Sequence, residues 1–524
     1  MIGPDIFAFA ALWRRYRQCR RNKRHTINAL AFEINAEANL LALQEELRAH
    51  TYKPGRSICF ITDGPKPREV FAADFRDRVV HHLLVSHQER VFEPIFIHDS
   101  YACRKGKGTL AASDRLMTFL RQETANGRRP AWAVKLDVAN FFPSIHKATL
   151  HEILARKIAH PELRWLTRTL LFHDSTTNYR FRSRDPRAHG PESRRYPVPP
   201  YKSLFGKQNL RGLAIGNLTS QFWANVYLNE LDQFVKRGLK CRHYLRYVDD
   251  MVLLAPDREP LVRWCAAIEA FLAQRLKLVL RPEMGVPFSV RKGIDFIGWK
   301  TWWNRRLPRR RTLGNLRARL AGFERAAVRP VGAGAARRID LVRQDGAGSV
   351  DRLRSVLASY SGHLRHGAAW RVWREVWERY PWLAALFARQ GWALDARWSR
   401  RRLGRVRRFQ AQYWHLARHA GDDALVFFPV GRFIEFYGPQ RAAAARALGL
   451  REVALPRACY ALTAGFPMHL FGRYRSRALR QGLTVIEVRQ TPAALGRGCR
   501  PRQACAVWIP GELNRIWGRA TVTH

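Results

Sequence analysis

The chain has 524 residues, of which 47% are apolar, so it is long enough for several folded domains with buried cores. Its 92 Lys and Arg against 42 Asp and Glu give a formal net charge of +50, which favours a polyanionic partner, nucleic acid above all. An acidic membrane surface is the alternative, but the sequence has no amphipathic anchor and no apolar run of about 18 residues.

The first 130 residues predict a mixed α/β region. Met1–Leu12 is a poor signal peptide because Pro4 and Asp5 interrupt it, so we expect a cytoplasmic protein. Leucines at helical spacing predict a helix near residues 40–47, and short apolar runs between Pro and Gly residues predict strands at 58–61 and 69–72. A helical pattern returns over 77–91. The eight cysteines lack zinc-ligand spacing.

Residues 131–300 contain two apolar runs that end in aspartate. Trp132–Leu136 predicts a buried strand that ends at Asp137. Apolar residues flank Asp249-Asp250 on both sides, which predicts a β-hairpin with the two carboxylates at its tip. Paired carboxylates repel each other, and a divalent cation would relieve that repulsion. The alternative is an ordinary acidic turn, with Asp137 as a strand-end or helix-capping residue.

The later elements change character twice. A helix is expected from about Thr219 or Ser220 to Gly238, and residues 182–200 are expected to be a loop insertion. Residues 301–396 carry Arg, Ala and Leu at helical spacing, 397–420 form a basic linker, and 421–524 change to short strands and turns.

Several segments, in order along residues 50–300, resemble the palm and fingers of reverse transcriptases. They are REV at 68–70, FRDRVV at 75–80, SYACRKGKG at 100–108, LD at 136–137 with FF at 141–142, GLAIGNLTSQ at 212–221, YVDD at 247–250 and FIGW at 296–299. The resemblance implies an α+β right-hand polymerase: N-terminal extension and fingers at 1–130, palm at 131–300 and helical thumb at 301–396.

The resemblance also implies residue roles. Asp137, Asp249 and Asp250, with the Val138 carbonyl, would hold two Mg²⁺ ions for nucleotidyl transfer from dNTPs. Arg68 and Arg76 would meet the triphosphate, since the guanidinium donates two hydrogen bonds to phosphate oxygens. For Arg76 a solvated surface position remains the alternative.

Two further positions would contact the incoming nucleotide. Phe142 would exclude a ribose 2′-hydroxyl, so that DNA is the product, with a core aromatic as the alternative. Most reverse transcriptases have Gln-Gly and Ser-Pro where this chain has Ile215-Gly216 and Ser220-Gln221. This variant form resembles the enzymes of diversity-generating retroelements, which copy template RNA with errors at adenines. Ile215 lacks a directional hydrogen bond, which predicts lower fidelity.

The C-terminal segments resemble the mismatch-recognition domain of the MutS family. They are GRFIEFY at 431–437, ARALGL at 445–450, AGFPMH at 464–469 and VIEVRQ at 485–490. The resemblance implies that Phe433 wedges beside a mispaired base and Glu435 bonds its edge. A core position is the alternative for Phe433. No ATP-binding GxxxxGK[ST] motif follows, so a binding module is expected.

Together these patterns predict an error-prone RNA-directed DNA polymerase, of bacterial or phage origin by resemblance, that copies a retroelement template RNA into adenine-mutated cDNA. Its partners would be the template RNA, the cDNA/RNA hybrid and an accessory protein of the retroelement. The first alternative is a retron or defence-associated reverse transcriptase without programmed mutagenesis. The second is a nucleic-acid-binding protein with a relic palm. The priming mechanism, target gene, oligomeric state and general acid stay open.

Overall fold

The structure, a computed structural model, describes residues 5–21, 26–62, 67–182, 190–191, 196–207, 209–331, 335–341, 349–397, 409–454, 462–490 and 502–511. The chain divides into two compact units, Met1–Arg305 and Arg306–His524. Most of the expected loop insertion at 182–200, and residues 398–408 of the expected linker, lie outside the described residues.

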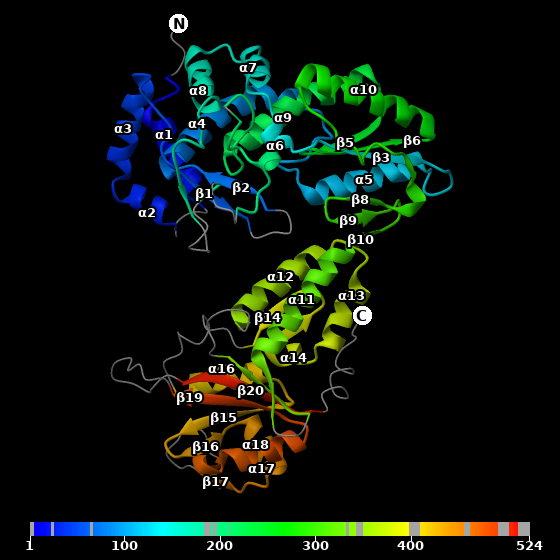
Figure 1. The fold of residues 1–524 in the computed structure, drawn as a ribbon. Coiled ribbons are helices and arrows are strands. Elements are labelled where there is room, and N and C mark those ends of the chain that lie inside the picture. Colours follow the sequence, from blue (N-terminus) through cyan, green and yellow to red (C-terminus); the bar gives the residue numbers. More distant parts are fainter. Residues whose placement is uncertain are drawn as a thin grey trace. The chain divides into compact units, whose positions relative to one another are not determined.

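The first unit begins with helices packed beside a small sheet (Figure 1). Strand β1 pairs antiparallel with β2 and parallel with β4. Helix α4 packs on α1, α2, α8 and α9, so its residues are buried along most of its length. The elements are α1 (Phe9–Arg20), α2 (Ile27–Ile34), α3 (Ala36–Arg48), β1 (Ser57–Ile61), β2 (Glu69–Ala72), α4 (Phe75–Phe92), α5 (Thr109–Glu123), α7 (Lys147–Ala155), α8 (Pro161–Leu171) and β4 (Tyr179–Phe181).

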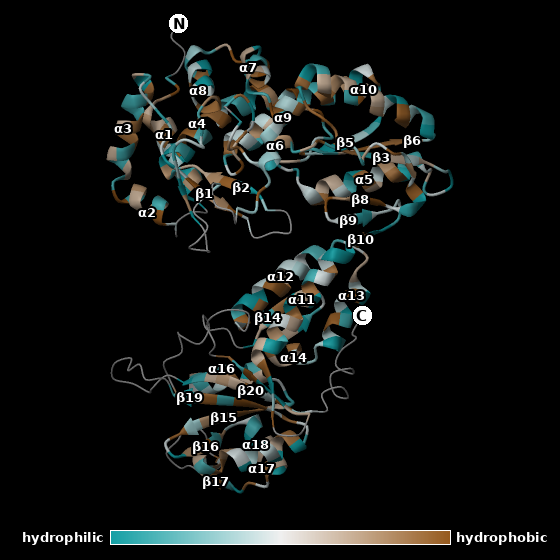
Figure 2. Ribbon diagram, viewed as in Figure 1, coloured by the Kyte–Doolittle hydropathy of each residue, from teal (hydrophilic) through white to brown (hydrophobic). Residues whose placement is uncertain are grey.

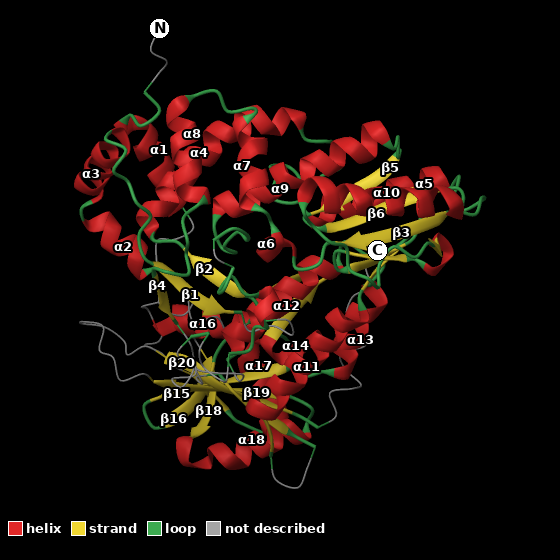
Figure 3. Cartoon of the chain, turned by 45° about the horizontal axis from the view of Figure 1, so that its top comes forward, coloured by secondary structure: helices red, strands yellow, loops and turns green. Residues whose placement is uncertain are grey.

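A four-stranded sheet in the order β5-β6-β3-β7 carries both predicted aspartate strands. Helices α9 and α10 pack with one face of this sheet, and α5 covers the other (Figures 1 and 3). Strand β3 is therefore buried on both faces, as its apolar run predicts. The elements are β3 (Trp132–Asp137), α6 (Phe141–Ser144), α9 (Leu218–Gln233), β5 (His243–Tyr247), β6 (Asp250–Ala255), α10 (Arg258–Leu276), β7 (Phe288–Ser289), β8 (Ile294–Phe296) and β9 (Trp299–Thr301).

The described part of the second unit consists of helices, the antiparallel pair β13–β14 and an eight-stranded sheet in the order β11-β12-β20-β19-β15-β16-β18-β17. Its elements up to residue 396 are β10 (Arg306–Pro308), α11 (Arg310–Ala327), β11 (Val328–Pro330), β12 (Arg337–Asp340), α12 (Val350–Leu364), α13 (Trp370–Arg379), α14 (Leu383–Leu386), β13 (Phe387–Gln390) and β14 (Ala393–Ala396). The rest are α16 (Phe409–Ala420), β15 (Ala424–Val430), β16 (Phe433–Phe436), α17 (Pro439–Leu448), β17 (Glu452–Ala454), β18 (Leu462–Pro467), α18 (Phe471–Arg480), β19 (Thr484–Gln490) and β20 (Arg502–Ile509).

The eight-stranded sheet contains strands from two regions that the sequence pattern assigns to different domains. Strand β12, from the expected thumb, pairs antiparallel with the C-terminal strand β20. One apolar core contains Leu320 of α11 and Trp373 of α13 together with Phe428 and Val507 from the sheet. The brown interior of this unit in Figure 2 follows that core. The expected boundary at residue 421 therefore falls inside one compact unit, because β11 and β12 form by pairing with a distant edge.

None of the described helices combines the length and the apolar composition that crossing a bilayer requires. The described secondary structure is a mixture of helices and sheets, as the α+β prediction has it.

Candidate active site

The predicted hairpin exists and has a two-residue loop. Tyr247 of β5 pairs with Asp250 of β6, which leaves Val248 and Asp249 as the turn. Val248 has φ +55°, a left-handed conformation that is rare for a β-branched residue. Such strain persists only where surrounding contacts enforce it, and it is common at active sites.

Asp137 and Asp250 lie directly opposite each other. They are register partners of the β3–β6 pair, and opposite residues of antiparallel strands point to the same side of a sheet. The Asp249 and Asp137 carboxyl groups lie within hydrogen-bonding reach of each other, so a proton on one of them would be shared with the other. Burial and the nearby charge of Asp137 raise the pKa of Asp249 to about 7. The three predicted carboxylates therefore gather at one end of the sheet.

Sequence analysis did not identify Arg281, which contacts this cluster. Its Nε lies 3.1 Å from Asp137 Oδ2, and its backbone N–H donates to the Asp137 carbonyl at 3.0 Å. Burial raises the pKa of Asp137, while Arg281 acts in the opposite direction. The residues after α10 run antiparallel past the end of β3, and this tertiary pairing has no local sequence signal.

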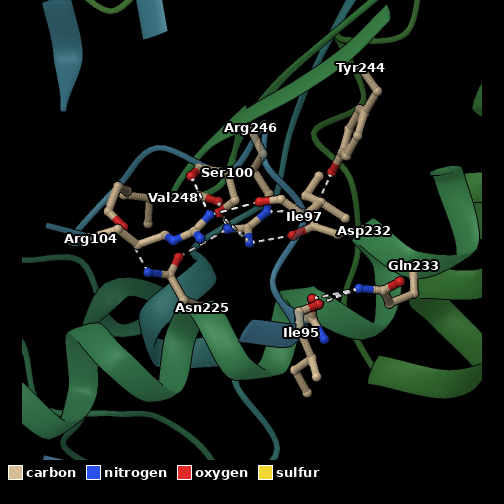
Figure 4. Close-up of polar contacts among 12 residues, drawn as sticks. Ile95, Ile97, Ser100, Arg104, Asn225, Asp232, Gln233, Tyr244, Arg246 and Val248 are labelled. Atoms are coloured by element: carbon tan, nitrogen blue, oxygen red, sulfur yellow. Dashed lines mark hydrogen bonds and ion pairs between the residues drawn. The ribbon is translucent and has the colours of Figure 1, made fainter. Parts of the chain in front are cut away.

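A buried ion pair supports the hairpin turn (Figure 4). Arg246 and Asp232 are 1% and 0% exposed as side chains, and the guanidinium donates to both carboxylate oxygens at 2.8 and 2.6 Å. Arg246 Nη1 also donates to the Val248 carbonyl at 2.8 Å. Ser100, Asn225 and Tyr244 complete the hydrogen bonds of the pair. The network thus holds the strained residue next to Asp249.

The backbone of Arg246 is hydrogen-bonded to the segment before α5. The Arg246 backbone N–H donates to the Asp99 carbonyl at 2.9 Å, and the Arg246 carbonyl accepts from the Tyr101 N–H at 3.0 Å. Arg104 donates to the Ile97 and Ser100 carbonyls. Strand β5 is therefore fixed on its outer edge by the loop at 97–104 rather than by another strand.

The donor chemistry of the carboxylate cluster fits Mg²⁺. Carboxylates that hold a shared proton when metal-free are deprotonated by a divalent cation, and Mg²⁺ in nucleotide enzymes takes one or two carboxylates plus substrate phosphates. The two backbone hydrogen bonds at the Val138–Leu280 bridge have the carbonyls of Asp137 and Val279 as acceptors. The Val138 carbonyl, which is a predicted metal ligand, accepts neither of them. Within the described ranges, no three His, Cys, Asp or Glu side chains form a ready-made metal site. Substrate phosphates would therefore complete the coordination.

The segment with Ile215 lies between two other predicted contacts. The Phe71 N–H of β2 donates to the Ile215 carbonyl at 2.8 Å, and Arg68, which is exposed, directly precedes β2. On its other side the Leu213 N–H donates to the Phe142 carbonyl at 2.9 Å. Phe142 is half-buried beside the buried Phe141, and Gln221 is exposed in the first turn of α9.

Gly216 is required by this arrangement. Its φ is +118°, and a Cβ here would lie 2.8 Å from Val70 Cγ1 and 3.1 Å from the Phe71 carbonyl oxygen. Only glycine permits the segment to approach β2 this closely.

The Arg76 side chain contacts residues outside the cluster of Asp137, Asp249 and Asp250. Its guanidinium is hydrogen-bonded to Glu46 and lies 5.2 Å from the centre of the Tyr52 ring. These contacts connect α4 with the N-terminal helices. A role for Arg76 at the triphosphate stays a prediction, and it would require these contacts to break.

In the second unit, Phe433 is 49% exposed, which excludes the core position considered for it. It lies at the start of β16, opposite Pro467 of β18. Glu435 follows on the same side of the strand and accepts a hydrogen bond from the Tyr437 hydroxyl. Burial, reinforced by this bond, raises the pKa of Tyr437. Phe433 is thus available to a ligand, and Glu435 has a partner.

Comparisons with known proteins assign both regions. Residues 64–300 match the family described as reverse transcriptase (RNA-dependent DNA polymerase), and residues 407–516 match MutS domain I. The chain is similar to an uncharacterized 91 kDa protein in the cob intron of Schizosaccharomyces pombe, with 24% identity over 185 residues. These cover 35% of this chain and 19% of the relative.

Among solved structures, telomerases from Candida albicans and Candida tropicalis match with TM-scores of 0.33 and 11% identity each. The matches cover 60% and 52% of this chain, and 54% and 58% of the telomerase chains. Because these scores are low, the assignment rests on the two families matched by sequence. The chain spans a fifth of the length of the curated relative and just over half of the telomerase chains. Its match to the reverse transcriptase family is followed along the chain by its match to MutS domain I.

Proposed function

We propose that the protein is an RNA-directed DNA polymerase in which Asp137, Asp249 and Asp250 bind the catalytic Mg²⁺ ions. The observation that carries this proposal is the carboxylate cluster at the end of β3 and the β5–β6 turn, where Asp137 lies opposite Asp250 and within reach of Asp249. Bound Mg²⁺ would activate the primer 3′ oxygen and stabilise the leaving pyrophosphate. The family as a whole uses divalent metal ions and dNTPs.

The chain's own residues would position the reactants. Arg246 fixes the turn that presents Asp249, and Arg281 orients the Asp137 carboxylate. Because Arg281 also lies beside the carboxylate that would hold Mg²⁺, we propose that it stabilises negative charge on the phosphates. Arg68 and the Ile215 segment flank β2 and would contact the incoming nucleotide.

We further propose that synthesis is error-prone at template adenines, as in diversity-generating retroelements, and that cDNA copied from a retroelement RNA diversifies a target gene. Support comes from Ile215, half-buried in a segment that is held by backbone bonds on both sides. An apolar side chain there gives shape contact without directional bonding, so mispairs are rejected less strongly.

The test is to sequence cDNA made by the purified chain on a primed RNA with Mg²⁺ and dNTPs. We expect errors concentrated at template adenines, no product from Asp249→Ala, and fewer adenine errors from Ile215→Gln. Ile215→Leu is the matched control, because it stays apolar and should keep the error pattern. Accurate cDNA from the unaltered chain would instead favour the retron or defence-associated alternative, and absence of Mg²⁺-dependent incorporation would contradict the polymerase proposal.

For the C-terminal module we propose binding to a distorted nucleic-acid duplex through the exposed Phe433. Its nearest candidate ligand is the cDNA/RNA hybrid with mismatches that error-prone synthesis leaves behind. Template RNA with internal bulges presents the same unstacked base steps and would compete for the site.

A further inference from the structure

A cavity of about 50 Å³ lies in the first unit, behind the segment that carries Ile215. It is bounded by α4, α7, α8 and the start of α9, which pack against one another (Figure 1). Gly212, Leu213 and Asn217 line it from the segment side. Since a water needs about 10–15 Å³ of such space, the cavity has room for a few waters or one tetrahedral oxyanion.

Two histidines at the cavity have unpartnered ring nitrogens. His81 is 5% exposed, and among the described residues neither its buried Nδ1 nor the buried Nε2 of His173 has a hydrogen-bond partner. Burial lowers the pKa of His81 to about 3 and also lowers that of His173, so both rings are neutral at pH 7 and each can donate one N–H. Buried polar atoms without partners are rare and indicate a missing ligand or water.

The cavity is lined by three cationic side chains, Lys147, Lys207 and Arg211, and by two carboxylates, Asp77 and Asp174. Lys147 is 5% exposed and bonds to the Asn209 side chain, while Lys207 has no ion pair in the described part of the chain. The oxygens of Asp77 already accept from the Tyr52 hydroxyl and the Gly55 N–H, each at 2.8 Å. Asp174 Oδ1 accepts twice from Thr176.

The start of α9 adds backbone donors. This helix is 16 residues long and its N-cap Asn217 makes no side-chain capping bond, because its Oδ1 accepts from Ala73 instead. Thr219 and Ser220, both buried, line the cavity from the first turn. Free N–H groups at a helix start attract phosphate-like anions.

We propose that this cavity binds a phosphate-type oxyanion held by Lys147, Lys207, His81, His173 and the first turn of α9. The bound anion would contact residues 212–221 from the cavity side, and this segment also carries Ile215 and Gln221. Bound anion would therefore set the position of the segment that we expect to contact the incoming nucleotide. The site itself does not depend on the fidelity proposal.

The test is hydrogen–deuterium exchange of the full chain in inorganic phosphate against chloride of equal ionic strength. We expect slower exchange in peptides covering residues 171–176 and 212–221. Lys147→Met should raise the phosphate concentration for half-maximal protection at least about tenfold, since a charge-assisted bond is lost. Lys157→Met removes the same charge from an exposed position and should leave the protection unchanged.

A parallel titration with pyrophosphate separates two sources of the ligand, free phosphate and the product of nucleotidyl transfer. Protection at lower concentration by either anion supports the site and names its source. If Lys147→Met does not fold, Lys207→Met, which alters a half-buried side chain, takes its place. Absence of protection at saturating phosphate, or equal protection in the lysine variant and its control, would overturn the proposal and leave the cavity as a water site.

Discussion

Replacing Asp249 by Asn should stabilise the metal-free protein while it abolishes polymerase activity. The wild-type carboxyl group is buried beside Asp137, so its ionisation is unfavourable in the folded state. Asparagine has nearly the same shape and does not ionise. The variant therefore removes the repulsion between the two carboxylates and also removes a proposed Mg²⁺ ligand.

The size of the effect follows from the pKa. It rises from 3.8 to about 7 on folding, so the folded state binds this proton more tightly than the unfolded state. The wild-type protein therefore loses stability as the pH increases through this window, and the loss is complete above pH 7. At 1.36 kcal/mol per pKa unit the loss is on the order of 4 kcal/mol.

The assay is thermal unfolding of the first unit in EDTA at pH 5 and pH 8. With an average unfolding entropy per residue, a difference of about 4 kcal/mol corresponds to roughly 6 °C for a unit of this size. We expect Asp249→Asn to unfold about 2 °C above the wild type at pH 5, where part of the loss is already present, and about 6 °C above it at pH 8. Added Mg²⁺ should raise the unfolding temperature of the wild type alone.

The matched control is Asp257→Asn, which removes one carboxylate at the exposed N-cap of α10, where it makes no capping bond. Its unfolding temperature should follow that of the wild type at both pH values. An Asp249→Asn variant that is no more stable than the wild type at pH 8 would refute the shared-proton interpretation of the carboxylate pair.

Three further substitutions test other parts of the structure. Arg246→Met leaves Asp232 buried and unpaired, which should lower the free energy of unfolding by about 3–5 kcal/mol. Adding Asp232→Leu should restore the unfolding temperature. Polymerase activity should not return, because the Val248 carbonyl still lacks its hydrogen bond from Arg246. Gly216→Ala should raise the KM for dNTPs severalfold in steady-state assays, with folding intact by circular dichroism. Phe433→Ala should weaken binding to a mismatched hybrid about tenfold by fluorescence anisotropy, whereas Val453→Ala, equally exposed on β17, should not.

The sequence was sufficient to predict the strands of the four-stranded sheet that carry Asp137 and Asp250. Apolar runs that end in Asp137 and surround Asp249 encode strands locally, because their spacing and composition alone favour burial at the centre of a sheet. The same holds for α9, predicted to begin at Thr219 or Ser220 and found to begin at Leu218. The roles of the nucleotide-binding residues and the adenine specificity stay predictions.

Contacts between distant segments could not be predicted in this way. Arg281 and Asp232 pair with residues that lie far from them along the chain, Asp137 and Arg246 respectively. Neither residue differs in its local sequence from a charged residue on the surface. Strands β11 and β12 are short, arginine-rich and close to helices, so their composition indicates a helical region. They become strands because the edge of β20 offers hydrogen-bond partners.

The pairing of β12 with β20 has a consequence for how the protein can be dissected. A truncation after residue 420 would strip β12 of its partner and expose apolar side chains of α11, α13 and α16 to water. Loss of activity in such a fragment would report damage to the core that α11, α13 and α16 share with the sheet, whatever the missing segment binds. Surface substitutions within the intact chain are therefore the means to separate recognition from synthesis.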